Sequence, residues 1–507
     1  MVTSPSTQPP ATPRPASAEI VLGVVLIAAA GLLRWRASLG EFWLDEVWTW
    51  QISQKLTWPG GLFYQLQEEN NHYLNTLWIW LVGPNAWWGW YRLLPVLCGT
   101  LSVTLAWKLA APSASPRSAT APVPWVTPWI AAALSACSYL LIHYSSEARG
   151  YAYAVMFSAW AFLELPQAIT DQLQAQASGS SEGLGRARLR FTLAACGGFL
   201  SQPVFLTCYG AMVIWTLLKL RRSSDSGLAL PVLWKTFFPS GAFFVALYLI
   251  DLKNAVNGGG DVYPLWQVIL ETLSLTGGGP SQMGMLAVVT AGLVLGAFGQ
   301  GLRVLRRDHD DRWVFYLLVV VVMPLLLLVV LRRAEVYPRY FILSVFFLIQ
   351  AAAIGLADLL HRSWAGRSVA VVTLLACMVG NGQQYERLAM YGRGSYMNLL
   401  LRMAQDEPTA EIVVMTDHPF RHEMMCRYYE LRCDLRGKTL KLVPPPEPEA
   451  PVTEPAPWLL VHKLDPAWQP KAAIMTRQGF KYQLQQVEPY AGLSGWGLAL
   501  YRIQPGD

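Results

Sequence analysis

Charged residues are scarce in this chain, and their scarcity excludes most classes of soluble protein. Only 14% of the 507 residues are charged, whereas 53% are hydrophobic. Soluble proteins carry about 25% charged residues on average. The composition therefore predicts a protein that spans the membrane several times. The net charge of +6 lies in short clusters between apolar runs rather than on one continuous face, so nucleic acid is not an expected partner.

Motifs for nucleotides and for compact metal sites are also missing. The glycine-rich stretches 258–260 and 277–279 follow no strand and precede no Lys-Ser or Lys-Thr pair, which argues against a phosphate-binding loop. The segment 253–282 that contains them is either a lid over a ligand cleft or a plain connection. Most of the seven cysteines lie in apolar runs. Cys426 and Cys433 lie outside these runs and either form a disulfide or stand too far apart on one helix.

Long apolar runs define the architecture. The first, residues 20–39, predicts a retained helix, because its length is that of a span and no convincing small-residue cleavage site follows it. Taking about 20 apolar residues as one crossing, residues 19–383 predict an α-helical polytopic membrane domain with about eleven membrane segments. The later runs are 91–110, 124–143, 151–170, 230–252, 283–302, 313–331, 341–360 and 369–379, and two short membrane-dipping helices are expected within 191–220.

Loop charges predict the orientation of the chain in the membrane. Clusters of Lys and Arg fall on one side, which the positive-inside rule makes cytoplasmic, together with a disordered, Pro- and Ser-rich tail at residues 1–18. Arg332, Arg333 and Arg339 fall on the other side, where they either anchor a helix end or hold an anionic ligand. The basic clusters lie at 108–117, 186–190, 219–235, 303–312 and 361–367.

A large loop at residues 40–90, called the external loop below, concentrates polar groups on the non-cytoplasmic side. Asp45 and Glu46 lie there among tryptophans, and segment 73–82 suits an interfacial helix. An acidic pair held beside a membrane is a functional-site hypothesis, and the alternative is a helix cap. On the same side, Arg92, Glu147 and Arg149 either pair with one another or flank the acidic pair.

The composition becomes that of a soluble protein near the C-terminus. Residues 384–507 predict a small extracytoplasmic α/β domain, with a proline-rich linker at 444–457. The pair Asp417-His418 follows a predicted strand and is typical of a turn. The expected strands are 411–415, 458–462, 480–485 and 496–503, and the expected helix is 421–431.

Five short motifs occur in an order that resembles the GT-C superfamily of membrane glycosyltransferases. More narrowly, the order is similar to that in protein O-mannosyltransferases, aminoarabinose transferases and their bacterial relatives. The resemblance covers about residues 20–360. The motifs are Leu44-Asp45-Glu46, Asn70-Asn71-His72-Tyr73-Leu74-Asn75-Thr76-Leu77, Arg92-Leu93-Leu94-Pro95, Ser146-Glu147-Ala148-Arg149-Gly150-Tyr151-Ala152 and Pro338-Arg339-Tyr340-Phe341.

This resemblance implies an enzyme that transfers a hexosyl or pentosyl group from a polyprenyl-phosphate donor. The acceptor would be a protein, lipid or glycan hydroxyl at the extracytoplasmic face of a bacterial inner membrane. The family's catalytic acid residue maps onto Asp45. Many relatives have His-Pro-Pro where this chain has His72-Tyr73-Leu74, which leaves the role of His72 open.

The chemistry of transfer suggests a role for each polar group. Asp45 would take the acceptor's proton, and Glu46 would orient the acceptor or assist through a bound cation. A single displacement with inversion is the simplest mechanism, and a covalent intermediate is the alternative. A divalent cation would find ligands in Asp45, Glu46 and His72, although no compact spacing marks a site. Arginines would bind the donor phosphate. The expected phosphate ligands are Arg92, Arg149, Arg339, Arg332 and Arg333, and the expected substrate-binding residues are His72, Glu147, Tyr151 and Tyr340.

The competing class is a non-enzymatic transporter or binding protein for lipid-linked sugars. Such a protein is expected to contain structural repeats, with interrupted helices at corresponding positions of its two halves. The sequence has no such symmetry.

Overall fold

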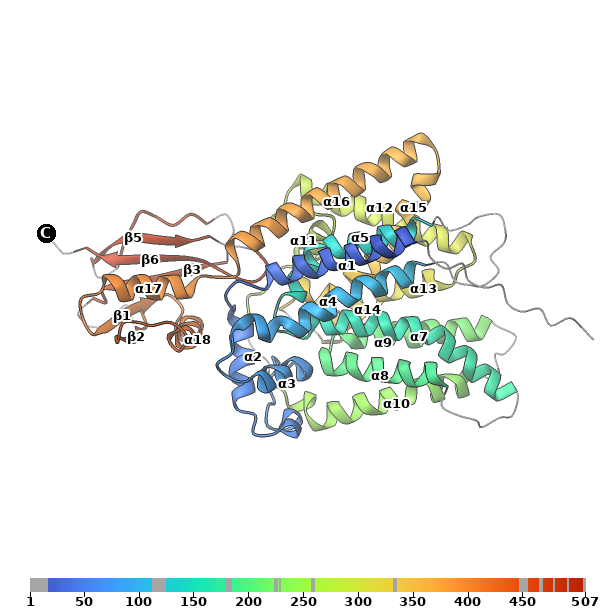
Figure 1. Cartoon of the computed structure of the whole chain (residues 1–507), viewed down its shortest axis with the longest axis horizontal. Helices are drawn as coiled ribbons and strands as arrows, with labels where there is room; N and C mark the ends of the chain where they lie inside the picture. Colours follow the sequence, from blue (N-terminus) through green and yellow to red (C-terminus); the bar gives the residue numbers. More distant parts are fainter. Residues whose placement is uncertain are drawn as a thin grey trace, which may run out of the picture.

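A bundle of long helices and a smaller mixed α/β domain lie end to end in the molecule (Figure 1). The computed structural model describes residues 17–111, 125–177, 185–222, 227, 229–256, 260–331, 335–445, 455–464, 468–476, 479–489 and 492–504. The helices of the bundle and its outer surface are α1 (Ser17–Ala37), α2 (Leu44–Gln54), α3 (Tyr73–Val82), α4 (Trp88–Ala110), α5 (Thr127–Cys137), α6 (Tyr139–Ser145), α7 (Tyr151–Ala177), α8 (Arg186–Ser201), α9 (Phe205–Arg222), α10 (Ala229–Ile250), α11 (Leu265–Thr276), α12 (Met285–Arg307), α13 (Arg312–Leu317), α14 (Met323–Leu331), α15 (Ile342–His361) and α16 (Trp364–Tyr391).

Six helical stretches of the described residues are long and apolar enough to cross a membrane, as expected for an integral membrane protein. The predicted multi-spanning helical class is confirmed, but the number of about eleven crossings is not. Helices α7, α8, α9 and α10 run side by side in Figure 1, although only α10 belongs to the six. The six stretches are Ala18–Ala37, Trp88–Ala110, Ala229–Asn254, Met285–Arg307, Pro338–His361 and Trp364–Asp406.

The predicted run 124–143 is divided into two helices at Ser138. The backbone of Ser138 leaves the helical conformation there, with ψ 117°, and ends α5. The peptide N–H of Tyr139, freed by this break, donates to Asn381 Oδ1 of α16 at 2.7 Å. Helix α6 is buried along its whole length and leads into the turn at 146–150, which carries two of the predicted site residues.

Small residues allow α12 and α15 to pack closely. A Cβ atom on Gly301 would overlap the Ala351 carbonyl oxygen, and one on Gly355 would overlap the Ala297 carbonyl oxygen. Such close approach of backbones is typical of helices that pack in a membrane. Helix α15 is therefore fixed in place immediately after Arg339, which precedes it in a short 3-10 helix, η5 (Pro338–Phe341).

The C-terminal domain is a six-stranded sheet with two helices. Its strands run in the order β2-β1-β3-β6-β5-β4, with β1 parallel to β2 and β3 and the remaining pairs antiparallel. The predicted C-terminal α/β fold is confirmed, but α17, β2 and β4 were not predicted. Cys426 and Cys433 are free thiols, so the disulfide alternative is wrong. The elements are α17 (Tyr396–Asp406), β1 (Glu411–Thr416), α18 (Pro419–Glu430), β2 (Thr439–Val443), β3 (Trp458–Lys463), β4 (Ala473–Met475), β5 (Lys481–Glu488) and β6 (Gly497–Ile503).

The core of the C-terminal domain continues into the external loop. Phe42 stacks on Tyr428 of α18 with ring centroids 5.7 Å apart, and Trp50 of α2 meets the same ring edge-on at 5.1 Å. The Tyr429 hydroxyl donates to the Phe42 carbonyl oxygen at 2.9 Å. Helix α2 is therefore held between the bundle and α18, and Asp45 and Glu46 lie in its first turn.

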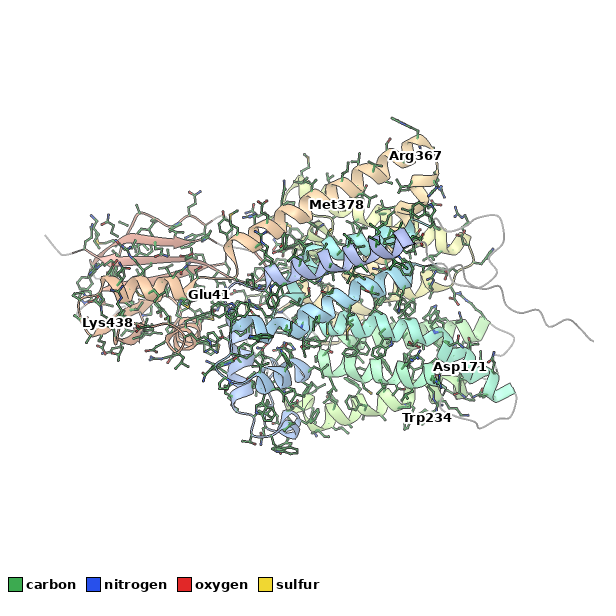
Figure 2. All side chains as sticks on the ribbon, in the orientation of Figure 1. Glu41, Asp171, Trp234, Arg367, Met378 and Lys438 are labelled. Carbon is green, nitrogen blue, oxygen red and sulfur yellow. The ribbon has the colours of Figure 1, made fainter. Side chains whose placement is uncertain are left out.

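Glu41 lies at the junction of the two parts of the molecule, as its label in Figure 2 shows. Its carboxylate accepts a hydrogen bond from the Met397 N–H, in the first turn of α17, at 3.3 Å. Burial raises the pKa of Glu41 from its ordinary value of 4.5 to about 8, despite the hydrogen bonds from the α17 backbone.

We expect Glu41→Gln to remove part of the pH dependence of stability. Between pH 4.5 and pH 8 the folded protein keeps a proton on Glu41 that the unfolded chain releases, so stability falls as the pH rises through this window. Glutamine keeps an acceptor oxygen but does not ionise. The measurement is the thermal unfolding midpoint in detergent across this pH range, with exposed Glu411→Gln as the control. Identical pH profiles for wild type and Glu41→Gln would contradict the raised pKa.

Candidate functional site

Asp45 and Glu46, in the first turn of α2, have different roles: one is a helix cap and the other faces the candidate site. Glu46 caps the helix, because its Oε2 accepts from the Trp43 N–H at 3.3 Å, which is the half of a capping box that an N3 glutamate supplies. Asp45 makes no such cap and turns toward two arginines. The helix-cap alternative therefore describes Glu46, and the functional-site hypothesis is left with Asp45.

Glu46 and Arg92 form a fully buried ion pair. Arg92 donates from Nε to Glu46 Oε1 at 2.7 Å and from Nη2 to Oε2 at 2.5 Å, and both side chains are 0% exposed. Glu46 Oε1 also accepts from the Ala148 N–H at 2.7 Å. The remaining donors of Arg92 go to backbone carbonyl oxygens of Ser38, Gly40 and Glu41. This pair ties together α2, α4 and the turn at 146–150, and none of its polar groups is left for a ligand.

Asp45 faces two guanidinium groups with one oxygen. Its Oδ2 lies 2.5 Å from Arg149 Nη1 and 3.3 Å from Arg339 Nη1. The carboxylate is 14% exposed, and its Oδ1 accepts no hydrogen bond from the described residues. An oxygen that is held in place and still available is what a base needs.

Arg149 is locked into the external loop. It donates from Nε to His72 Nε2 at 3.1 Å and from Nη2 to Asn70 Oδ1 at 2.8 Å, in addition to its bond to Asp45. Asn70 in turn donates to the Asp45 carbonyl oxygen at 2.6 Å. The close approach of Gly150 permits this arrangement, since a Cβ there would overlap the Ser201 carbonyl oxygen and press on His72. Three segments distant in sequence thus converge on one guanidinium.

His72 serves as an acceptor in this network. A guanidinium only donates, so His72 Nε2 must carry the lone pair and Nδ1 the proton. Burial and the charges of Arg149 and Arg339 lower the pKa of His72 well below its ordinary value, which keeps the ring neutral. The ring also packs against Tyr151, with centroids 5.8 Å apart.

Arg339 has more unpaired N–H groups than Arg149, its neighbour in this cluster. Its guanidinium stacks over Tyr337 at 4.4 Å and lies 5.6 Å from the Tyr340 ring. Its Nε has no hydrogen-bond partner, and its only ion pair to a described residue is the 3.3 Å contact of Nη1 with Asp45. At 18% exposure it is reachable, so it offers unpaired N–H groups to an anion. Arg332 and Arg333, also predicted to bind phosphate, lie outside the described residues.

Glu147 does not join this cluster, contrary to the prediction that it binds substrate. It is fully buried, and its Oε1 lies 3.0 Å from His143 Nε2 and 3.4 Å from Arg393 Nε. The Ser494 hydroxyl donates to the same oxygen at 2.6 Å. Since Ser494 and Arg393 belong to the C-terminal part of the chain, Glu147 holds that part against the bundle.

Arg393 and Ser494 have structural roles that no sequence motif indicated. Arg393 donates to carbonyl oxygens of Ala37 and His143 and to the Ser146 hydroxyl. The sequence signal for these residues was an adjacent glycine. Gly392 precedes Arg393 and Gly495 follows Ser494, and both have positive φ angles, of 65° and 128°.

The predicted cation ligands do not fit a metal. Arg149 lies between Asp45 and His72 and donates to both, and Arg92 uses both oxygens of Glu46. A guanidinium therefore fills the position that a cation would need. Within the described part of the chain, a group of side chains spaced for a metal lies instead in the C-terminal domain.

No family model and no curated protein sequence matches this chain. The structure is similar to ArnT from Cupriavidus metallidurans in the apo state, with a TM-score of 0.48 and 12% identity over 84% of this chain and 86% of ArnT. ArnT bound to undecaprenyl phosphate gives a TM-score of 0.46 and 13% identity over 96% and 98% of the two chains. An oligosaccharyltransferase from Archaeoglobus fulgidus, in complex with Zn and sulfate, gives 0.48 and 10% over 82% and 62%.

ArnT, an aminoarabinose transferase, and the oligosaccharyltransferase are both GT-C glycosyltransferases, the superfamily whose motif order this sequence resembles.

Proposed function

We propose that this protein is a glycosyltransferase that moves a sugar from a polyprenyl-phosphate donor to an acceptor hydroxyl. The observation that carries the proposal is the pairing of Arg339, a cation with unpaired donors, with Asp45, a carboxylate with an unpaired oxygen, at 3.3 Å. Transfer from a lipid phosphate needs both a cation for the phosphate and a base for the acceptor.

The site and the C-terminal domain lie on the extracytoplasmic side in this proposal, in a bacterial inner membrane. The last turns of α9 and α12 are basic, and Arg367 lies at the end of the bundle away from the sheet in Figure 2. By the positive-inside rule, that basic end is cytoplasmic. The cluster around Asp45 then lies at the opposite surface, where a polyprenyl-phosphate head group can reach it.

The two arginines of the cluster have different tasks. Arg339 binds the donor phosphate with its unpaired N–H groups, and it stands at the start of the membrane-spanning stretch 338–361, so the lipid chain can extend along the bundle. Each of the three guanidinium nitrogens of Arg149 already donates to a protein group, so Arg149 adds positive charge and holds Asp45 in place. Arg92 and Glu46 position the loop and do not contact the substrate.

The reaction is a displacement at the anomeric carbon of the donor sugar. The acceptor oxygen forms a bond to that carbon while the bond from the carbon to the phosphate oxygen breaks. The electron pair of the broken bond goes to the phosphate, whose charge Arg339 stabilises, and the acceptor proton goes to Asp45 Oδ1. A single such step inverts the configuration of the sugar.

We expect Arg339→Gln to weaken binding of a polyprenyl phosphate by roughly 10- to 150-fold, because hydrogen bonds to charged groups contribute about 1.5–3 kcal/mol. The measurement is equilibrium binding of the lipid phosphate to the protein in nanodiscs. Arg367→Gln, at the opposite end of the bundle, is the matched control and should bind as wild type does. Equal affinity of the two variants would remove Arg339 from the phosphate site.

The proposed activity is tested with the full chain in nanodiscs, supplied with labelled hexosyl and pentosyl polyprenyl phosphates and a membrane extract as the acceptor source. We expect one of these donors to be consumed, with equal amounts of free polyprenyl phosphate and of a glycosylated product. Tight binding of the donors without any product would favour a carrier or binding protein over a transferase.

A further inference from the structure

Three side chains converge in the C-terminal domain, away from the cluster around Asp45. Asp417 follows β1, His422 lies in α18, and His462 lies in β3. Asp417 Oδ1 is 2.9 Å from His422 Nε2 and 2.9 Å from His462 Nδ1, and one ligand atom of each residue lies within 4.8 Å of the others. The neighbouring parallel strands β1 and β3 bring Asp417 and His462 together at their carboxyl ends.

Each imidazole of this group is oriented by a second hydrogen bond. His422 Nδ1 lies 3.1 Å from the Tyr396 hydroxyl, and His462 Nε2 lies 3.0 Å from Arg421 Nη1. The Tyr396 hydroxyl can accept the Nδ1 proton of His422, as the outer partner of a metal-binding histidine does, whereas Arg421 only donates and makes His462 Nε2 an acceptor in the metal-free state. The atoms turned toward Asp417 are therefore His422 Nε2 and His462 Nδ1, both held toward one point.

Ligation requires a deprotonated carboxylate and neutral imidazoles, and this group offers one carboxylate and two imidazoles. His422 is buried, whereas Asp417 is 26% exposed and leaves an open side for the ion and for water.

We propose that Asp417, His422 and His462 bind a divalent transition-metal ion, Zn²⁺, with water completing a four-coordinate site. Two imidazoles and one carboxylate are a ligand set that suits Zn²⁺ and not the oxygen-preferring Mg²⁺ or Ca²⁺. Bound ligands at about 2.0–2.2 Å from Zn²⁺ stand roughly 3.3–3.5 Å apart, so the three atoms reach this geometry by small side-chain shifts.

Metal binding at His462 changes the hydrogen bonds that Arg421 can make. A metal on Nδ1 of His462 leaves the ring proton on Nε2, so this nitrogen no longer accepts from Arg421 Nη1. Arg421 Nη2 also lies 3.5 Å from Asp261, in the segment before α11. The Asp261 carbonyl oxygen accepts from the Tyr337 hydroxyl at 3.0 Å, and Tyr337 stacks on Arg339. Metal binding thus leaves Arg421 free to pair with Asp261. Asp261 contacts Tyr337, and Tyr337 contacts Arg339.

Metal binding to the full chain in detergent, after removal of metal with a chelator, tests this inference. Titration with Zn²⁺ should give one equivalent bound to wild type and an increase in the thermal unfolding midpoint. Co²⁺ should give the visible absorption bands of a four-coordinate site. Asp417→Asn and His462→Gln should bind more than about 100-fold more weakly, because each loses a direct ligand. His418→Gln, next to the group but outside it, is the matched control.

Arg421→Gln distinguishes a built site from adventitious binding by surface histidines. It removes a donor and a positive charge that oppose the metal, so Zn²⁺ should bind this variant at least as tightly as wild type. His462→Cys supplies a replacement ligand and should restore binding with a thiolate-to-Co²⁺ absorption band, which a misfolded variant would not show. Wild type without an equivalent of Zn²⁺ above that in Asp417→Asn, or without four-coordinate Co²⁺ bands, would overturn the proposal.

Discussion

Asp45→Asn is expected to lower the rate of sugar transfer by about 10²- to 10⁴-fold, the range that general bases contribute. Asparagine has nearly the same size and keeps an oxygen for Arg149 to bind, so the loop should remain in place. What is lost is the capacity to accept the proton of the acceptor hydroxyl. The donor should bind no more weakly, because Arg149 and Arg339 no longer share their charge with a carboxylate.

The measurement is initial rate and donor affinity for purified Asp45→Asn in nanodiscs. Glu68→Gln is the matched control, since Glu68 is another carboxylate of the external loop that pairs with Lys55, 2.6 Å away, and with the Trp48 ring N–H. This control should transfer at nearly the rate of wild type. Transfer by Asp45→Asn at the rate of wild type would remove Asp45 as the base.

Arg92→Met is expected to destabilise the protein by about 3–5 kcal/mol, the cost of breaking a buried ion pair by removing one partner. Glu46 would keep its charge without any exposure to water, and three backbone carbonyl oxygens would lose their donor. The double variant Arg92→Met/Glu46→Leu should recover part of the loss, because it leaves no unpaired charge.

Thermal or denaturant unfolding of the purified variants measures this effect, with proteolysis of the external loop as a second readout. The result also decides between the two roles considered for Arg92. If Arg92→Met were as stable as wild type and instead bound polyprenyl phosphate weakly, Arg92 would be a phosphate ligand, as the sequence first suggested. The structure favours the positioning role because all of its donors already have protein acceptors.

Regular elements were largely predictable from the sequence, because hydrophobic length and periodicity are local properties. The interfacial helix expected at 73–82 is α3 with these bounds, and the strand at 458–462 is β3. Helix α11 was missed because glycine-rich stretches on both sides of it resemble a continuous loop. Helix α2 was considered only as a segment that the acidic pair might cap.

The separate roles of the charged residues were not predictable from the sequence, since these roles depend on contacts between distant segments. Arg92, Arg149 and Arg339 are alike in sequence, and only their partners separate a locked arginine from an available one. The partners of Asp417 were not predictable for the same reason. Its neighbour His418 suggested a turn, whereas its actual partners are His422, one helical turn away, and His462 on another strand.

A structure of the protein in nanodiscs with a bound polyprenyl phosphate tests the proposed function most directly. We predict that the phosphate oxygens lie within hydrogen-bond distance of the unpaired N–H groups of Arg339, with Asp45 Oδ1 facing the position of the sugar and the Glu46 pair with Arg92 unchanged. A phosphate bound elsewhere, with Arg339 still directed only at Asp45, would contradict the assignment of this cluster as the transfer site.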